Sequence, residues 1–212
     1  MHSQEEIRKA SELIGSLLSE WCLNSPADVF FEKLNKEFFV FGPDDYPRLR
    51  FNYVIANNAI VVIALNEYFQ TAAPIFIDAF QEVFLKQSKQ FHTMNVAIGD
   101  YVRTEKDITQ FAHIFAPPQG TSIADVQINL HALIEIIQGI RLRGYIEAYQ
   151  QSKNNDPIFG PIGKLSYLFA QHVFGDAAFN EPASKGPMLA TLFGLSFADD
   201  LNGIISTLSK MK

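Results

Sequence analysis

Apolar residues recur at steps of three and four along residues 122–153 of this chain. That spacing places them on one side of an α-helix, which completes a turn about every 3.6 residues. A helix of about 30 residues at about 1.5 Å per residue is about 45 Å long, roughly the length of a domain of this size. The pattern therefore predicts a long central helix around which other helices pack. The positions of the stripe are Ile123, Val126, Leu130, Leu133, Ile137 and Ile140.

Helix-starting residues and the same periodicity predict about seven helices in all. Ser3 with Glu6 forms a capping box, in which each side chain satisfies a backbone N–H group of the first turn. Pro26 after Ser25 is typical of the first position of another helix. The expected helices begin near Ser3, Ser25, Pro74, Thr104 and Ser122, and two more cover 162–174 and 187–209.

Residues 37–66 have the features of strands. Polar and apolar residues alternate over 48–53, and a run of β-branched residues follows the pair Asn57 and Asn58. Asn tolerates the positive φ that a tight hairpin turn needs. We therefore expect a small antiparallel sheet in this region. A buried helix over 49–69 is the alternative, because a short apolar run fits either structure.

The predicted fold class is α+β and helix-rich, with an all-α bundle as the alternative. We expect a single domain over residues 1–212, because neither half shows an independent core and this length fits one domain. The segment 152–161 combines Ser, Asn, Asp, Pro and Gly, and it is the best candidate for a boundary between subdomains.

The charge of the chain bears on its partners. The net charge is −6, and the 17 Lys and Arg residues are scattered. Nucleic acids and anionic membrane surfaces bind clustered positive charge, so we expect neither as the main partner. The uncharged stretch 51–66 contains four Asn residues and is shorter than a bilayer span of about 20 residues, which favours core over membrane.

The cysteine content and the N-terminal sequence favour a reducing compartment. Cys22 is the only cysteine, so an intramolecular disulfide or a cysteine zinc site cannot form, and we expect a buried thiol. The polar N-terminal sequence has no feature of a targeting segment. We expect a cytoplasmic protein.

One polar stripe of the long helix is the sharpest candidate for a ligand site. His131, Gln138 and Tyr145 fall on one face, with Glu135 and Arg141 beside it. Such side chains would anchor a small molecule, and Arg binds carboxylates and phosphates. A solvated helix face and a buried polar network are the simpler alternatives. His131 and Glu135 alone do not make a metal site, so we expect no metal.

Other polar residues are assigned structural roles. His172 lies among Phe, Ala and Val residues, which is typical of a histidine in a core or at its boundary. Asp199 and Asp200 are interpreted as the solvated side of an amphipathic C-terminal helix.

The motifs of common enzyme classes are absent from the sequence. There is no Gly-rich phosphate loop, Gly-x-Ser-x-Gly, His-Glu-x-x-His or Cys-x-x-Cys, so no catalytic residue and no cofactor is assigned. The chain has 19 Phe, which gain most from burial in a core, an interface or a cavity. We therefore expect a non-enzymatic binding or regulatory protein that acts through protein contacts, with a protein partner or a second copy of itself.

Two further functions remain open from the sequence. The first is a small-molecule-binding protein or an enzyme with an aromatic-lined cavity, in which His131, Glu135 and Arg141 converge. The second is a metal-independent ribonuclease that uses His131 with Arg141 or Arg143, which would require salt-sensitive RNA binding.

Overall fold

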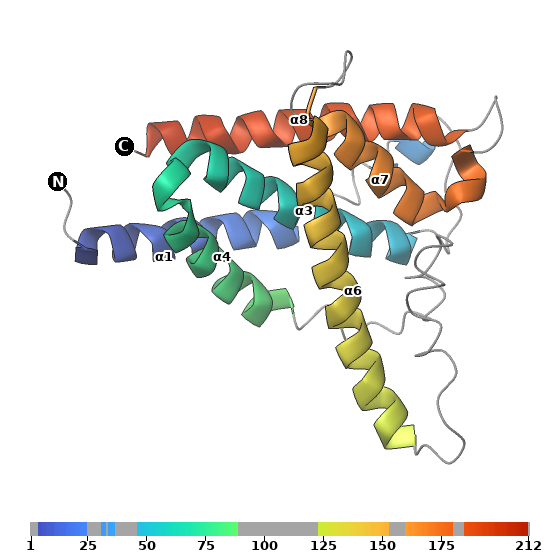
Figure 1. The fold of residues 1–212 in the computed structure, drawn as a ribbon, viewed down its shortest axis with the longest axis horizontal. Coiled ribbons are helices and arrows are strands. Elements are labelled where there is room, and N and C mark those ends of the chain that lie inside the picture. Colours follow the sequence, from blue (N-terminus) through green and yellow to red (C-terminus); the bar gives the residue numbers. More distant parts are fainter. Residues whose placement is uncertain are drawn as a thin grey trace. The chain divides into compact units, whose positions relative to one another are not determined.

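The computed structural model describes residues 4–24, 31–32, 34–36, 46–88, 123–152, 160–179 and 185–211 (Figure 1). Over these residues the secondary structure is helical, with six α-helices and two short 3-10 helices. The α-helices are α1 (Gln4–Asn24), α3 (Tyr46–Phe69), α4 (Ala73–Ser88), α6 (Ile123–Ser152), α7 (Ile162–Phe174) and α8 (Lys185–Lys210), and the 3-10 helices are η2 (Gln70–Ala72) and η5 (Asp176–Phe179).

Helix α3 replaces most of the predicted sheet, and the hairpin prediction is wrong. The described residues contain no strand, and residues 37–45, the first part of the expected sheet, lie outside them. The side chains of α3 are buried on every side between Ile55 and Leu65, so the helix lacks a polar stripe that would show its period. Asn57 and Asn58 are both buried within α3 and do not form a turn. The fold is therefore helix-rich, and the all-α alternative is the one that the structure supports.

The other predicted helices agree with the structure wherever they can be compared. Helices α1 and α4 begin within a few residues of the expected positions, and α6, α7 and α8 both begin and end within a few residues of them. The helix expected from Ser25 is described only at 31–32 and 34–36, which are helical. The helix expected from Thr104 lies outside the described residues.

The chain divides into two compact units. Unit 1 consists of residues 1–40, 57–94 and 197–212, and unit 2 of residues 41–56 and 95–196. Helices α3 and α8 each contribute residues to both units. Each unit therefore combines segments that are distant in sequence.

In unit 1, α1 packs closely along α4. Gly15 permits this approach, because a Cβ there would lie 2.9 Å from the backbone nitrogen of Phe80. One turn further along α1, the hydroxyl of Ser19 donates a hydrogen bond of 2.8 Å to the side-chain oxygen of Gln87. The second half of α3 joins the unit through Asn58, whose side-chain oxygen accepts a 2.7 Å bond from Gln81 of α4.

In unit 2, the second half of α6 packs on α7 (Figure 1). Gly144 faces α7, since a Cβ at this position would lie 3.6 Å from a methyl group of Leu168. Phe169 of α7 is fully buried, and its ring makes edge contacts with Tyr53 of α3 at 6.3 Å and with Phe193 of α8 at 4.6 Å between centroids. Aromatic side chains thus join three helices of this unit.

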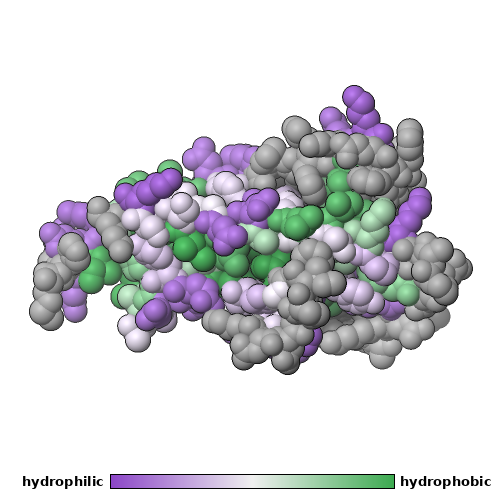
Figure 2. All heavy atoms as spheres, turned by 90° about the horizontal axis from the view of Figure 1, so that it is seen from above, coloured by the Kyte–Doolittle hydropathy of each residue, from purple (hydrophilic) through white to green (hydrophobic). Residues whose placement is uncertain are grey.

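Apolar and charged residues share the surface. Figure 2 shows hydrophobic residues reaching one face of the molecule between hydrophilic ones. Leu13, Leu17 and Leu85 of unit 1 are exposed by 58%, 48% and 55%. Scattered exposed leucines are ordinary, so their significance depends on what lies beside them.

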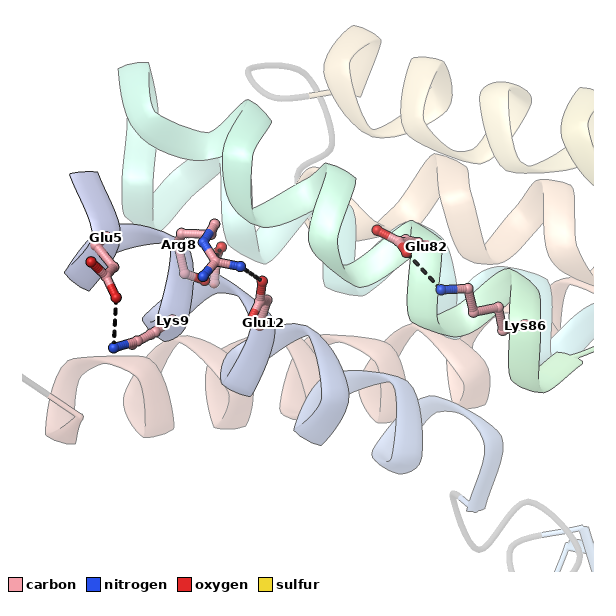
Figure 3. Close-up of polar contacts among 7 residues, drawn as sticks. Glu5, Arg8, Lys9, Glu12, Glu82 and Lys86 are labelled. Atoms are coloured by element: carbon pink, nitrogen blue, oxygen red, sulfur yellow. Dashed lines mark hydrogen bonds and ion pairs between the residues drawn. The ribbon is translucent and has the colours of Figure 1, made fainter.

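The exposed faces of α1 and α4 carry ion pairs between residues four apart (Figure 3). Glu5 pairs with Lys9 at 2.9 Å, and Glu82 pairs with Lys86 at 2.6 Å. Lys86 lowers the pKa of the Glu82 carboxyl, first through this hydrogen bond and then through its charge. These solvated pairs mark the outer faces of the two helices.

Two stretches are long and apolar enough to cross a membrane by length and composition, Leu49–Gln87 and Lys185–Lys210. Core helices of soluble proteins meet the same criteria. Within the first stretch, Leu49, Ile60 and Leu65 have no exposed surface in this fold, whereas Ile75 and Leu85 are about half exposed.

Candidate functional site

A concave groove in unit 1 is lined by described residues. It lies between α1 and the C-terminal half of α8 and has a cavity volume of about 410 Å³. Its walls are mainly apolar side chains. The lining residues are Ile14, Leu17, Leu18 and Trp21 of α1, with Asp199, Asp200, Gly203, Ile204, Thr207, Leu208 and Met211 of α8 and the residue after it.

The α1 wall follows directly from the sequence of that helix. Its four lining residues recur at steps of three, one and three, so they form one apolar face. Ile14 and Leu18 are exposed by 7% and 9% and form the deep part of the wall. Leu17 remains 48% exposed at the rim, and Leu13 continues the apolar surface one turn before it at 58%. The α1 wall therefore has a buried base and an accessible edge.

The α8 wall leaves room for a ligand at its glycine. Ile204 and Leu208 are exposed by only 5% and 3%, whereas a Cβ built on Gly203 would meet no heavy atom within 4 Å. The hydroxyl of Thr207 donates its hydrogen bond back to the carbonyl oxygen of Gly203 at 2.9 Å. That hydroxyl is thereby satisfied within the helix, so it adds little polarity to the groove.

Among the described residues, Asp199 and Asp200 are the charged ones that line the groove. Asp199 is exposed, but Asp200 is partly buried, and its Oδ2 atom is shielded from solvent without a hydrogen-bond partner in the described structure. Burial, and secondarily the neighbouring charge of Asp199, raises the pKa of the Asp200 carboxyl from 3.8 to about 6. The groove thus has an apolar body and an acidic end.

The prediction that both aspartates lie on the solvated side of the helix is wrong for Asp200. Phe197, Asp200, Ile204 and Leu208 follow one another at steps of three and four, which places the carboxyl on the apolar face of α8. This spacing was visible in the sequence. The α1–α8 groove itself was not, because it depends on which helices pack together.

Among the described residues that line the groove, the ionisable side chains are the carboxyl groups of Asp199 and Asp200, and none is His, Cys, Lys or Arg. Across the described residues, no three His, Cys, Asp or Glu side chains are arranged to hold a metal ion.

A second cluster, in unit 2, contains two of the residues predicted from the sequence. Arg141 and Tyr145 of α6 are exposed by 2% and 0%, one turn apart on the same face. A guanidinium nitrogen of Arg141 donates a hydrogen bond to the side-chain oxygen of Asn52, which comes from α3. The guanidinium also lies 5.8 Å from the ring centroid of Phe51, within the range of a cation–π interaction.

Tyr145 extends this polar cluster to α7. Its hydroxyl shares a 2.9 Å hydrogen bond with Nδ1 of His172, which is exposed by 8%. Buried polar groups of this kind are tolerated because they bond to one another. His172 is thus a core histidine, as the sequence predicted.

Glu135 and Gln138, two of the other predicted site residues, are less buried than this cluster. Glu135 is exposed and Gln138 is partly exposed, whereas Arg141 is buried. Six residues at about 100° per residue separate Glu135 from Arg141, which places them on different faces of α6. The side chain of His131 lies outside the described residues.

Asn52 and His172 were not identifiable from the sequence as partners of this stripe. Both come from helices distant in sequence, and the prediction of a strand at Asn52 concealed its helical face. Among the α6 side chains that the structure describes, the buried ones are Ile137, Arg141, Tyr145 and Tyr149, at steps of four, and Ser152. The interpretation of this stripe as a solvated face is therefore wrong for Arg141 and Tyr145, which lie in a buried polar network.

Comparison of this chain with protein-family models, with curated proteins and with solved structures finds no match.

Proposed function

We propose that this chain is a non-enzymatic binding protein that acts as a subunit of a complex, with the α1–α8 groove as the surface on which a helix of a partner protein docks. The observation that carries the proposal is the groove, whose apolar walls continue to exposed Leu17 and Met211 at its rim. Exposed apolar surface beside an apolar concavity is typical of protein interaction sites.

The energetics of the rim support a docked helix. Leu13, Leu17 and Met211 retain 58%, 48% and 43% of their accessible surface. Covering a half-exposed Leu or Met contributes on the order of 1 kcal/mol each. An amphipathic helix offers apolar side chains at steps of three and four, which is the arrangement that fills a groove between two helices.

Native mass spectrometry of the gently purified protein, compared between two matched variants, tests the proposal. Leu17→Gln alters the groove rim, and Leu85→Gln alters an equally exposed leucine of α4 outside it. We expect the wild-type chain to retain a second protein subunit, Leu17→Gln to lose it, and Leu85→Gln to keep it. If the second subunit is another copy of this chain, the groove binds a helix of that copy and the protein is a homo-oligomer.

Two other results would contradict the proposal. An assembly that survives Leu17→Gln would overturn the groove as the docking surface. A monomer that carries a small molecule in a one-to-one ratio would favour the second candidate function, described next.

The second candidate is the binding of a small anionic molecule in unit 2. The observation that favours it is the burial of Arg141 and Tyr145 together, with His172 bonded to the tyrosine. Buried Arg is a strong ligand for carboxylate and phosphate groups. Because Arg141 is buried, it is not accessible to the phosphates of a nucleic acid. For this residue, the ribonuclease hypothesis is therefore weaker than the binding of a small anion.

A further inference from the structure

The dimensions of the α1–α8 groove match one face of a short helix. Its α8 wall extends from Asp199 to Met211, which is about 18 Å at about 1.5 Å per residue. Three apolar side chains at positions i, i+4 and i+7 of a docked helix span about 10 Å. The groove therefore has space along its length for those three side chains and for one more residue at its end.

One end of the groove is acidic. Asp199 and Asp200 supply two carboxyl groups, and the other lining residues that the structure describes are uncharged. The Oδ2 atom of Asp200 is buried without a hydrogen-bond partner within the described part of the chain. A buried oxygen of this kind is costly unless a donor reaches it, and a cationic donor makes the stronger bond.

We propose that the helix docked in the α1–α8 groove carries a Lys or Arg beside its apolar stripe, and that this cation binds the carboxyl groups of Asp199 and Asp200. The inference rests on the proposed function and specifies the chemistry of the partner. Apolar side chains of the partner provide the affinity, and its cation sets the direction in which the helix lies, because the acidic pair occupies one end only.

The sole tryptophan of the chain provides a direct readout, because Trp21 lines the groove. Two synthetic helical peptides without aromatic residues serve as probes. Both carry Leu at positions i, i+4 and i+7, and they differ only in a flanking Lys or Gln. Binding is followed by the fluorescence of Trp21 at low ionic strength, where an ion pair at a partly exposed site is least screened.

We expect the wild-type chain to bind the Lys peptide about tenfold or more tightly than the Gln peptide, as a charge-assisted hydrogen bond predicts. In Asp199→Asn/Asp200→Asn the two peptides should bind with about equal affinity. Asp78→Asn is the matched control, since Asp78 is an exposed carboxylate of α4 outside the groove, and it should keep the preference.

The outcomes separate the two proposals. Equal binding of both peptides by the wild type overturns the cationic partner but leaves the docking groove. Binding of neither peptide overturns the proposed function itself. A preference for Lys that persists in the double variant places the cation elsewhere and overturns the inference. Asp199→Asn alone alters an exposed side chain, so it gives a partial loss of preference even where the double variant does not fold.

Discussion

Asp200 is a carboxyl group held on the apolar face of a helix, and its titration should be visible in protein stability. Its pKa is raised from 3.8 to about 6, so the folded chain binds a proton more tightly than the unfolded chain. The carboxyl therefore makes its full contribution to the free energy of unfolding below about pH 4, and this contribution is lost as the pH rises through 6. At pH 8 we expect the unfolding free energy of Asp200→Asn to be about 1 kcal/mol higher than that of the wild type. This value is smaller than the full pKa shift implies, because solvent screens a partly exposed carboxyl.

Denaturant unfolding between pH 4 and pH 8 measures this difference. The advantage of Asp200→Asn should disappear toward pH 4, where the wild-type carboxyl is neutral as well. Asp78→Asn removes an exposed carboxylate of α4 and should show no such trend. A constant difference between Asp200→Asn and the wild type over this range would contradict the raised pKa.

Removal of the Tyr145 hydroxyl tests whether the polar cluster of unit 2 stabilises the fold. Tyr145→Phe keeps the buried ring and removes the 2.9 Å hydrogen bond to His172. We expect a loss of about 1–2 kcal/mol in unfolding free energy, because a buried hydrogen bond is lost without a change in packing. Tyr167→Phe is the control, since Tyr167 is 43% exposed on the same helix as His172 and should change stability little. Equal effects of the two changes on the denaturation midpoint would show that this hydrogen bond does not stabilise the unit.

At the scale of helices, Gly15 sets the distance between α1 and α4. A Cβ at this position would lie 2.9 Å from backbone atoms of Ala79 and Phe80, and backbone cannot move aside cheaply. We expect Gly15→Ala to destabilise the protein by about 1–3 kcal/mol through overpacking. Gly139→Ala on α6 should instead stabilise it by about 0.5–1 kcal/mol, because nothing lies within 4 Å of that Cβ.

Thermal unfolding of the two glycine variants measures the contrast. Both changes add one methyl group to a glycine inside an α-helix, so the intrinsic gain in helix propensity is the same. The difference between them therefore reports the packing of α1 on α4. A Gly15→Ala variant as stable as Gly139→Ala would show that the two helices do not pack as closely as in the structure.

Helices with one polar face were predictable, and helices without one were not. The ends of α6 and α7 follow from periodicity and from Pro and Gly near their limits, and both agree with the structure. Helix α3 is apolar almost all round between Ile55 and Leu65, so neither a helical nor a strand period dominates its sequence. The β-branched residues Ile60, Val61 and Val62 then favoured a strand, and burial among other helices overrode that preference.

The sites were less predictable than the helices. The sequence placed Arg141 beside the stripe that contains Tyr145, and in the structure the two are buried one helical turn apart on α6. It could not supply Asn52 or His172, since those partners depend on tertiary packing. The α1–α8 groove likewise joins Trp21 to Asp200 across most of the sequence, so local periodicity shows each wall but not the cavity between them.

For the whole chain, the boundary between the two units passes through the middle of two helices. Helix α3 contributes residues 46–56 to unit 2 and 57–69 to unit 1, and α8 is shared in the same way. The polar cluster at Arg141 lies within unit 2, and the groove lies within unit 1. The residues of the two sites therefore belong to different units, although α3 and α8 run through both.

Whether the chain is soluble is a question for the whole molecule, because Leu49–Gln87 and Lys185–Lys210 both meet the length and composition of a membrane span. Asn52 and Asn57 of the first stretch are fully buried, and the second carries Asp199 and Asp200 near its middle. Each such acidic residue costs about 2.5–3.5 kcal/mol at the centre of a bilayer. We therefore expect the chain to remain in solution without detergent and to enter the aqueous phase of a Triton X-114 separation, with a known single-span protein as the control. Recovery in the detergent phase with that control would identify the two stretches as membrane spans and would overturn the burial of α3 in a protein core.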